Sequence, residues 1–532
     1  MSAELVLRGR IRTLDPARPI AWAVAVAGGV ITGLDGEAVD SVGPGTEVLE
    51  VGAGLVLPAF RDGHAHPVWA GLELAEAPIA HARSVAEVVE AVRAHAAANP
   101  GLEWIRGGSY DPTLAPGGLF DARWLDAAVP DRPIYLESAD HHSAWVNTAA
   151  MRAAGLDADT PEPASSRLPR REEGQLLGTL VEWGAMDLIR RVLPARTSAE
   201  RLAAAATGSQ RLARQGIAWT LDAACSPADV EAYRAADGAG LLATRVECAL
   251  RADPGRWSEQ VGSFLAERAA AAGRVRAGTV KFFADGVVEF ATAAMLDPYA
   301  DSPHDCGLAV WEPAELAEAV AAFDAAGFGI HIHAIGDGGI RQALDALAGA
   351  RDRGQPGRTR PTLAHVQVLD PMDLPRFAAL GVVANAEPLW SCLDVCQRDL
   401  TAPRLGPVRS ARQYPWASLL GSGAAVSMGS DWPVSSERPL EGLAVAVTRQ
   451  TPDGVPAQGW LPAERLTVDQ AVAAYTRGTA YQAGEEGHRG VLAPGYAADL
   501  VWLSRDLWET PPLEWPAVEV LGTWVDGARS WG

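Results

Sequence analysis

The chain is poor in cysteine and in basic residues, and it contains no long hydrophobic run. Five cysteines among 532 residues are too few for the disulfide framework of a small secreted protein. Cys392 and Cys396 form one C-x3-C pair, but no second pair completes a zinc knuckle. We therefore expect these cysteines to be buried free thiols.

Acidic residues outnumber basic ones by 66 to 45, which gives a formal net charge of −21. Nucleic acids and anionic membranes repel such a chain, so neither is an expected partner. The longest apolar stretch near the start, residues 21–34, is too short to span a bilayer, and the first residues lack the features of a signal peptide. We expect a cytoplasmic protein.

No GxSxG elbow and no strand-linked GxGxxG occur, which argues against a serine hydrolase and a dinucleotide enzyme.

Two patterns divide the chain. Residues 1–54 and 488–532 contain short alternating runs broken by Gly and Asp, which predict antiparallel strands. Because domain termini often lie close together, we expect both ends to form one small β-sandwich domain. Residues 55–487 instead alternate short apolar runs with Ala- and Leu-rich helical stretches, which predicts a parallel sheet with covering helices.

The number of apolar runs in this middle region predicts an α/β fold, a (β/α)8 TIM barrel. There are eight: LVLPAFRDGHAH, IAWTLDAA, TRVECALRA, AGTVKFFADG, FGIHIHAIGD, PTLAHVQVL, GVVANAEP and AAVSMGSDWP. The first two are unusually far apart, since 160 positions separate Asp62 from Asp222. We therefore expect a large insertion after the first strand, about residues 70–205, that forms a partly helical cap over the barrel mouth.

Histidines gather at the ends of these runs. His64 and His66 are two apart, so on a strand their side chains point to the same side. Strand ends of a barrel converge, and imidazole nitrogens with a carboxylate are typical zinc ligands. We expect His333 to be a ligand and His331 to lie beside the site, where it orients ligands or contacts substrate. The further strand-end candidates are His365 and Asp431.

Lysine occurs once in the chain, at Lys281 in the fourth run, whereas the other 44 basic residues are arginine. A lone lysine in an apolar strand indicates a role that arginine cannot fill, because a guanidinium stays protonated and does not react with CO2. A buried neutral amine can form a carbamate that bridges two metals. Direct contact of the unmodified amine with water or substrate, and chance retention, are the alternatives.

Two further motifs are candidates for substrate contact. In the insertion, HSAWVN offers hydrogen bonds from His142 and Asn147 and an apolar face from Trp145. The alternative is a packed turn with the tryptophan in its core. After the fifth run, AIGDGG places Asp337 at a helix start, where it either positions substrate or simply caps the helix.

Together these motifs resemble the amidohydrolase superfamily of metal-dependent hydrolases, and more closely the YtcJ-like branch that includes N-substituted formamide deformylase. The resemblance covers nearly the whole chain. It is carried by LVLRGRIRTLD, the H-x-H after LPAFRDG, HHSAWVN, VKFFADG, HIHAIGD, the His365 strand, GSDWPV and GVLAPGYAADLVWLSRD.

The resemblance implies a barrel, a small β-sandwich and one or two divalent metals. Two positions depart from the branch: Ala364 stands where a Glu is usual, and His141 where a small residue is usual. Both departures concern substrate preference. Carried over by position, the first metal would be held by His64, His66 and Asp431, and the second by His333 and His365, with a carboxylated Lys281 as the bridge.

We therefore expect hydrolysis of a C–N bond in a small linear or cyclic amide, by a hydroxide that a metal, with zinc favoured, activates. Asp431 is the expected proton shuttle. We also expect a homodimer. One alternative is a mononuclear deaminase of a heterocycle, but the Glu that follows the fifth-strand histidine in such enzymes is missing after His333. The other is a non-catalytic barrel, which loss of ligands would mark.

Overall fold

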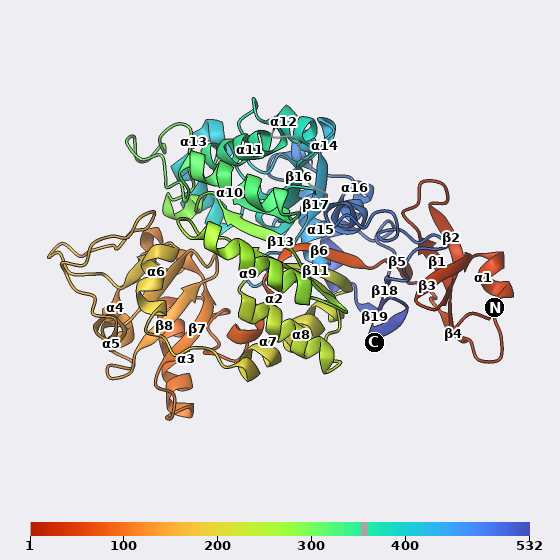
Figure 1. The fold of residues 1–532 in the computed structure, drawn as a ribbon, viewed down its shortest axis with the longest axis horizontal. Helices are drawn as coiled ribbons and strands as arrows, with labels where there is room; N and C mark the ends of the chain where they lie inside the picture. The colour runs from red at the N-terminus through yellow and green to blue at the C-terminus, as the bar shows by residue number, and fades with distance from the viewer. Residues whose placement is uncertain (1, 353–359) are drawn as a thin grey trace.

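The computed structural model describes residues 2–352 and 360–532. A parallel eight-stranded barrel lies between an inserted lobe at one end of the molecule and a sheet built from both chain ends at the other (Figure 1). Each of the eight predicted runs supplies one barrel strand, so the predicted barrel is confirmed. In chain order the strands are β6 (Phe60–Ala65), β11 (Ile217–Cys225), β12 (Arg245–Arg251), β13 (Val275–Phe283), β14 (Gly329–Ala334), β15 (Thr362–His365), β16 (Val383–Ala386) and β17 (Ala425–Met428).

The barrel strands pair in parallel and in chain order from β6 to β17. Most of their positions are buried, and in β11 all nine are, which explains why the sequence shows apolar runs instead of alternation. The segment after β17 returns to β6. The backbone N–H of Asp431 donates to the carbonyl of His64 at 2.7 Å, and that of His66 to the carbonyl of Trp432 at 2.7 Å. These bonds tie the first strand to the last.

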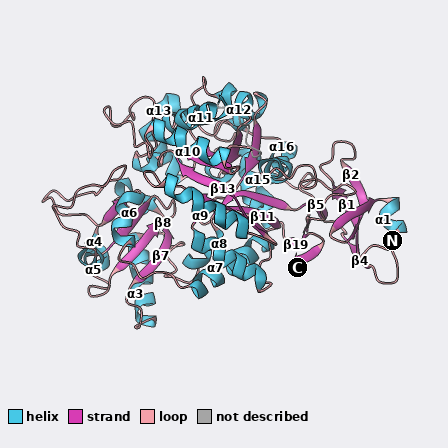
Figure 2. Cartoon of the chain, in the orientation of Figure 1, coloured by secondary structure: helices cyan, strands magenta, loops and turns pink. Residues whose placement is uncertain are grey.

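Helices surround the barrel and complete one large hydrophobic core (Figure 2). The helix before β11, α7 (Ser198–Arg214), begins at a capping box in which Thr197 and Glu200 satisfy each other's backbone N–H groups. It packs closely on α2 (Pro67–Glu73), and Gly208 makes this close approach possible. Any larger residue there would place its Cβ 2.4 Å from the Pro67 carbonyl oxygen. The other principal helices are α8 (Pro227–Gly238), α9 (Trp257–Ala270), α10 (Pro313–Ala325), α11 (Asp337–Asp352), α12 (Leu374–Leu380), α14 (Trp416–Gly421) and α15 (Pro439–Thr448).

The inserted lobe between β6 and β11 has a sheet and hydrophobic clusters of its own. The sequence predicted a partly helical cap; the structure adds four strands in the order β10-β9-β8-β7, which the sequence did not predict because each spans only three to six residues. The strands are β7 (Ile105–Tyr110), β8 (Ile134–Ser138), β9 (Ser143–Val146) and β10 (Thr179–Val181). The helices are α3 (Val85–Ala98), α4 (Ala122–Asp126), α5 (Thr148–Ala153) and α6 (Trp183–Arg190).

Residues from both ends of the chain share one sheet, in the order β20-β19-β18-β5-β1-β2-β3, with β4 paired to β1. Its central pairing is antiparallel and joins β5 to β18, with Leu503 opposite Leu55. Alternate residues of β1 enter two different clusters, Leu7 on one face and Val6 on the other. The strands are β1 (Leu5–Arg12), β2 (Ile20–Ala27), β3 (Val30–Leu34), β4 (Glu47–Glu50), β5 (Leu55–Pro58), β18 (Leu500–Leu503), β19 (Val520–Val525) and β20 (Ala528–Trp531).

Within the described part of the chain, no helix combines the length and the apolar character that crossing a membrane requires.

Candidate metal centre

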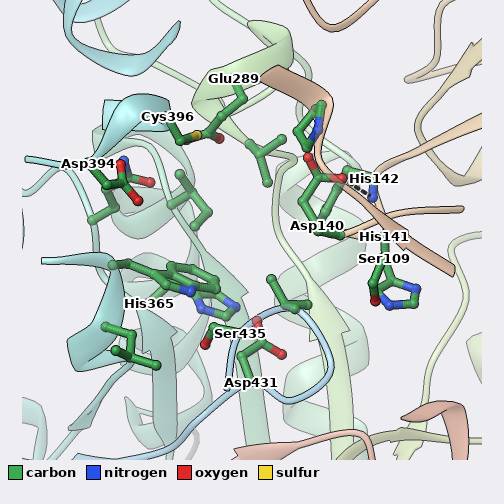
Figure 3. A pocket seen from close by; sticks show the side chains of 18 of the residues that line it. Ser109, Asp140, His141, His142, Glu289, His365, Asp394, Cys396, Asp431 and Ser435 are labelled. Carbon is green, nitrogen blue, oxygen red and sulfur yellow. Dashed lines mark hydrogen bonds between the residues drawn. The ribbon is translucent and has the colours of Figure 1, made fainter. Parts of the chain in front are cut away.

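A cavity of about 560 Å³ opens where the barrel strands end and the inserted lobe meets them. Barrel residues form its floor, and lobe residues such as Ser109, His141 and His142 form part of its wall (Figure 3). Aromatic and aliphatic side chains make up much of the remaining surface. Among these apolar lining residues are Trp69, Trp183, Phe283, Val287, Leu389 and Trp390.

Three predicted ligands come together on the cavity floor. His64 at the end of β6, His66 just beyond it and Asp431 after β17 each bring one ligand atom within 4.8 Å of the other two. Oδ1 of Asp431 lies 3.0 Å from Nε2 of His66 and 3.5 Å from Nε2 of His64. The backbone of Asp431 is left-handed, with φ of 53°. Asp adopts this region more readily than most residues, and the hydrogen bonds to β6 hold it there.

His333 and His365 lie together beside this group, with ring centroids 4.5 Å apart. Nδ1 of His365 is 3.1 Å from Glu387, and its ring stacks on Trp390 at 5.1 Å. Nε2 of His333 is 3.1 Å from the carbonyl of Gly286. The structure therefore brings both histidines to the same floor, next to the three-residue group.

The site combines neutral imidazoles with an ionised carboxylate. Burial lowers the pKa of His66 to about 4 and that of His365 to about 3. Burial opposes ionisation of Asp431, but the close approach of His66 outweighs burial, so the pKa of Asp431 falls below its usual value. Burial, with the nearby charge of Asp431, raises the pKa of Glu387 well above its usual value. A set of imidazole lone pairs and one carboxylate suits a divalent cation.

Several buried polar atoms at this site have no hydrogen-bond partner within the described residues. They include Nδ1 of His66 and Oε1 of Glu387, while Oδ1 of Asp431 and Oε2 of Glu387 are approached closely by His66 and His365, respectively. Unpaired buried polar groups are costly, and in native proteins they indicate a bound water or ion. The residues present therefore fit a cation between His64, His66 and Asp431.

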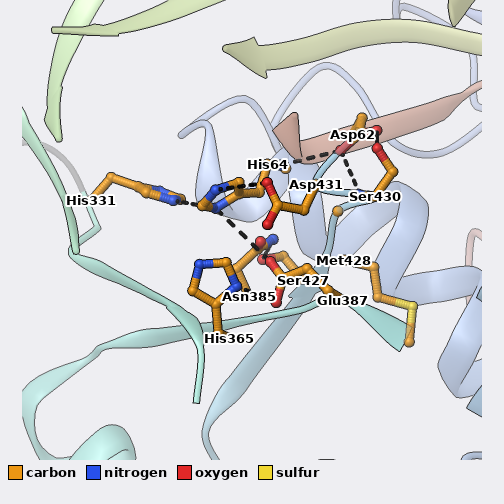
Figure 4. Close-up of polar contacts among 12 residues, drawn as sticks. Asp62, His64, His331, His365, Asn385, Glu387, Ser427, Met428, Ser430 and Asp431 are labelled. Atoms are coloured by element: carbon orange, nitrogen blue, oxygen red, sulfur yellow. Dashed lines mark hydrogen bonds and ion pairs between the residues drawn. The ribbon is translucent and has the colours of Figure 1, made fainter. Parts of the chain in front are cut away.

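A second layer of polar residues fixes the ligands (Figure 4). Nε2 of His331 lies 2.9 Å from Nδ1 of His64, so His331 contacts a ligand and not the cavity. Asp62 accepts from the backbone of His64 at 3.2 Å and from the Ser430 hydroxyl at 2.6 Å. This one carboxylate thus holds both ligand-bearing segments in place. The sequence did not single out Glu387, although it lies within the seventh run, directly after the end of β16, where a strand-end carboxylate could have been expected.

Of the three lobe residues predicted to contact substrate, only His142 lines the cavity. His142 lines the cavity, its ring is 5.2 Å from that of His333, and its Nδ1 lies 2.8 Å from Glu182. The predicted substrate contacts at Trp145 and Asn147 are not supported by their positions. Trp145 is 0% exposed and donates to the carbonyl of Asp121 at 3.0 Å. Asn147 caps α5 and donates to two backbone carbonyls of the lobe.

Asp337 has a structural position as well. It lies at the start of α11 and accepts from the backbone of Leu296 at 2.8 Å. It does not line the cavity, so its position does not support substrate contact; its carboxylate joins the start of α11 to the segment at Leu296.

Comparison with known proteins gives consistent results. Residues 52–530 match the family described as "Amidohydrolase family". The chain is 30% identical to Protein LONG AFTER FAR-RED 3 of Arabidopsis thaliana, over 99% of this chain and 91% of that protein. It is 27% identical to N-substituted formamide deformylase of Arthrobacter pascens, over 98% of this chain and 97% of that protein.

Solved structures share the fold. The crystal structure of an uncharacterized metal-dependent hydrolase from Pyrococcus horikoshii OT3 superposes with a TM-score of 0.74 at 21% identity, covering 96% of this chain and 99% of that one. The resemblance drawn from the sequence motifs is thus confirmed.

Proposed function

The chain belongs to the amidohydrolase family, and on that premise we propose that it hydrolyses a carbon–nitrogen bond of small amides at a divalent cation held by His64, His66 and Asp431. The observation that carries the proposal is the convergence of one ligand atom from each of these three buried side chains within 4.8 Å. The relative named as a formamide deformylase supports formamides and related amides as the substrate class.

Zinc is the proposed cation, because histidine nitrogens and a carboxylate oxygen are its usual ligands. When bound, such a cation supplies Lewis acidity, which polarises a carbonyl group and lowers the pKa of water. The proposed ligands of a second cation are His333 and His365, with Lys281 carboxylated between the two positions. Support comes from the 4.5 Å separation of the two rings and from Nζ of Lys281, which lies 3.4 Å from Nε2 of His64.

Asp431 is the proposed proton carrier. Its Oδ1 lies among the candidate ligands, 3.0 Å from Nε2 of His66, where it can accept a proton from the attacking water. The lowered pKa keeps the carboxylate in its basic form. After C–N cleavage the same proton passes to the departing nitrogen, which makes Asp431 base and then acid.

Two further features prepare the substrate. His142 lines the cavity and is oriented by Glu182 through Nδ1, which leaves its second ring nitrogen to hydrogen-bond the acyl oxygen or the amide N–H. Trp69 stacks on His66 at 4.1 Å and, with Trp183 and Phe283, covers the floor with apolar surface. Excluding water strengthens the polar contacts made inside.

The test combines metal content with turnover. Purified protein is stripped with a chelator, reloaded with zinc, and assayed for amine release from N-formyl and N-acyl amines. We expect about one to two cations per chain and hydrolysis that depends on reloading. Asp431→Asn should retain metal and lose about 10²–10⁴-fold in kcat. Asp40→Asn, which changes an exposed carboxylate of the terminal sheet domain, is the matched control.

Either of two results would overturn the proposal: a reloaded protein that releases no amine, or an Asp431→Asn variant with normal turnover. Absence of bound metal as well would favour the non-catalytic alternative.

A further inference from the structure

One wall of the cavity is acidic. We call the carboxylates of Asp111, Asp140, Glu289 and Asp394 the acidic wall; all four line the cavity. Figure 3 shows Glu289 and Asp394 near Cys396 at one end of the view and Asp431 at the other. Among the described lining residues no arginine occurs, and the one lysine, Lys281, belongs to the floor.

The carboxylates of the acidic wall make hydrogen bonds but form no direct ion pair within the described chain. Oε1 of Glu289 accepts from the Thr401 hydroxyl at 2.7 Å, and Oδ1 of Asp394 from the backbone of Gln397 at 2.8 Å. Asp140 accepts from the backbone of His142 at 2.8 Å, while its Oδ2 is buried without a partner. Within the described chain, no Lys, Arg or His nitrogen lies within 4.0 Å of any of the four carboxylates.

Positive groups reach the acidic wall only from a distance: the charges of His141 and His142 act on Asp140, and that of Arg398 acts on Asp394. Burial raises the pKa of Glu289, and the charges of Asp140 and Asp394 raise it further. Burial likewise raises the pKa of Asp140. Such shifts mean that the ionised forms would be stabilised by a positive group in the cavity.

The nearby histidines are each already paired directly with carboxylates outside the acidic wall. His141 lies between two carboxylates of its own, 3.0 Å from Glu73 and 2.9 Å from Glu137. His142 is paired with Glu182 at 2.8 Å.

Gln397 adds a neutral acceptor to the same wall. Its side chain lines the cavity and is 4% exposed, and its Nε2 donates to the Tyr414 hydroxyl at 3.1 Å. Its Oε1 is buried and has no hydrogen-bond partner. A buried acceptor beside carboxylates that lack an ion pair would be satisfied by a ligand with several hydrogen-bond donors.

The spacing of these groups favours an organic cation over a metal ion. The carboxylates of the acidic wall do not form a set of three ligand atoms within 4.8 Å of one another; the described residues that do are His64, His66 and Asp431. An ammonium group has three donors that can point to separate acceptors. Val287, Leu389 and Val395 line the cavity as well and offer apolar surface to a methylene chain.

We propose that the acidic wall binds a protonated amine at the far end of the substrate, so that the preferred substrates are amides whose N-substituent ends in an ammonium group, as in a monoacylated diamine. This inference rests on the proposed amide hydrolysis and narrows its substrate class. The ammonium contacts Glu289, Asp394 and the amide oxygen of Gln397, while the acyl group lies over His64, His66 and Asp431. The net charge of −21 favours the approach of cationic substrates.

The experiment compares three formamides of matched length on the metal-loaded protein: monoformyl cadaverine, which is cationic, N-hexylformamide, which is neutral, and N-formyl aminocaproate, which is anionic. We expect kcat/KM for the cationic substrate to exceed that of the neutral one by about tenfold, with the anionic one slowest. Glu289→Gln combined with Asp394→Asn should bring the ratio of cationic to neutral close to one. Glu37→Gln, an exposed carboxylate on α1 (Gly36–Asp40), should preserve the ratio.

Asp394→Asn alone guards against misfolding of the double variant, because Asp394 is exposed, and it should lower the ratio part of the way. A wild-type ratio of one or less, with the neutral formamide turned over, would overturn the inference and leave amide hydrolysis standing. If no formamide is hydrolysed, that result contradicts the proposed amide hydrolysis but does not test the acidic wall. Calorimetric binding of cadaverine, present in the wild type and lost in the double variant, then tests the acidic wall, and absence of binding would refute it.

Discussion

Nζ of Lys281 lies 3.4 Å from Nε2 of His64, inside the barrel. The side chain is fully buried, and burial lowers its pKa to about 7. An amine in this state can add CO2 and release one proton to give a carbamate, which a guanidinium cannot do. The one lysine of the chain thus stands where its chemistry differs most from that of arginine.

We expect Lys281→Arg to lose bound metal and activity as fully as Lys281→Ala, because neither side chain can form a carbamate. Added propionate should restore part of both to the alanine variant by supplying carboxylate oxygens. Metal content and amine release are the measurements, and Arg505→Lys, at an exposed position, is the control for introducing lysine elsewhere. An active Lys281→Arg variant would show that the charge alone suffices.

His331→Ala should weaken metal binding by about 10–100-fold, since the imidazole that contacts Nδ1 of His64 at 2.9 Å no longer orients that ligand. Competition with a chromophoric chelator measures the affinity. His488→Asn, which changes an exposed histidine, should leave it unaltered. Equal affinities in the His331→Ala variant and the wild type would mean that His64 is held by the remaining contacts.

Trp145→Ala should destabilise the inserted lobe by about 3–5 kcal/mol, because it empties a fully buried site between Tyr110 and Phe120. Urea unfolding followed by tryptophan fluorescence measures the loss. Trp124→Ala, at a position 38% exposed, should cost much less. The fraction that stays folded should keep its KM; a changed KM with unaltered stability would restore the substrate-contact interpretation.

His141 should make the stability of the lobe depend on pH. Burial opposes its protonation, but Glu73 and Glu137 outweigh burial and raise its pKa to about 10. The folded state therefore binds the proton more tightly than the unfolded state, where the pKa is about 6.5. The stabilisation is fully present below that value and is lost as pH rises through about 10.

Accordingly, the difference in free energy of unfolding between the wild type and His141→Asn should be largest near pH 6 and shrink steadily above about pH 7. Chemical denaturation at a series of pH values measures it. His81→Asn, at an exposed position, provides the reference for a histidine without such partners. A difference that stays constant up to pH 10 would contradict the assigned ion pairs.

The sequence predicted most reliably the buried barrel strands and the ligand-type side chains at their ends. Barrel strands are mostly buried, so they appear as apolar runs, and the histidines that end them were correctly brought to one floor. Glu387 was missed because its role depends on the fold, which places it 3.1 Å from His365. The lobe strands were missed because a segment such as β7, with two glycines and a serine, carries little periodic signal.

Trp145 and Asn147 illustrate a different limit. A motif identifies residue types, but which side of a short strand faces the cavity is set by pairing with neighbours that lie far along the chain. In β9 the partner strands β8 and β10 turn Trp145 inward, whereas His142, just before β9, reaches the cavity.

The bonds that tie β6 to the segment after β17 also determine when the site can exist during synthesis. Asp62 and Ser430 are 368 positions apart in the sequence. Contacts across such a separation form late, because closing so long a loop costs conformational entropy. A growing chain carries His64 and His66 long before Asp431 has been added, and the inserted lobe can complete its own core in the interval. The full set of ligands is therefore a product of the finished polypeptide, so metal loading would follow translation and not guide it.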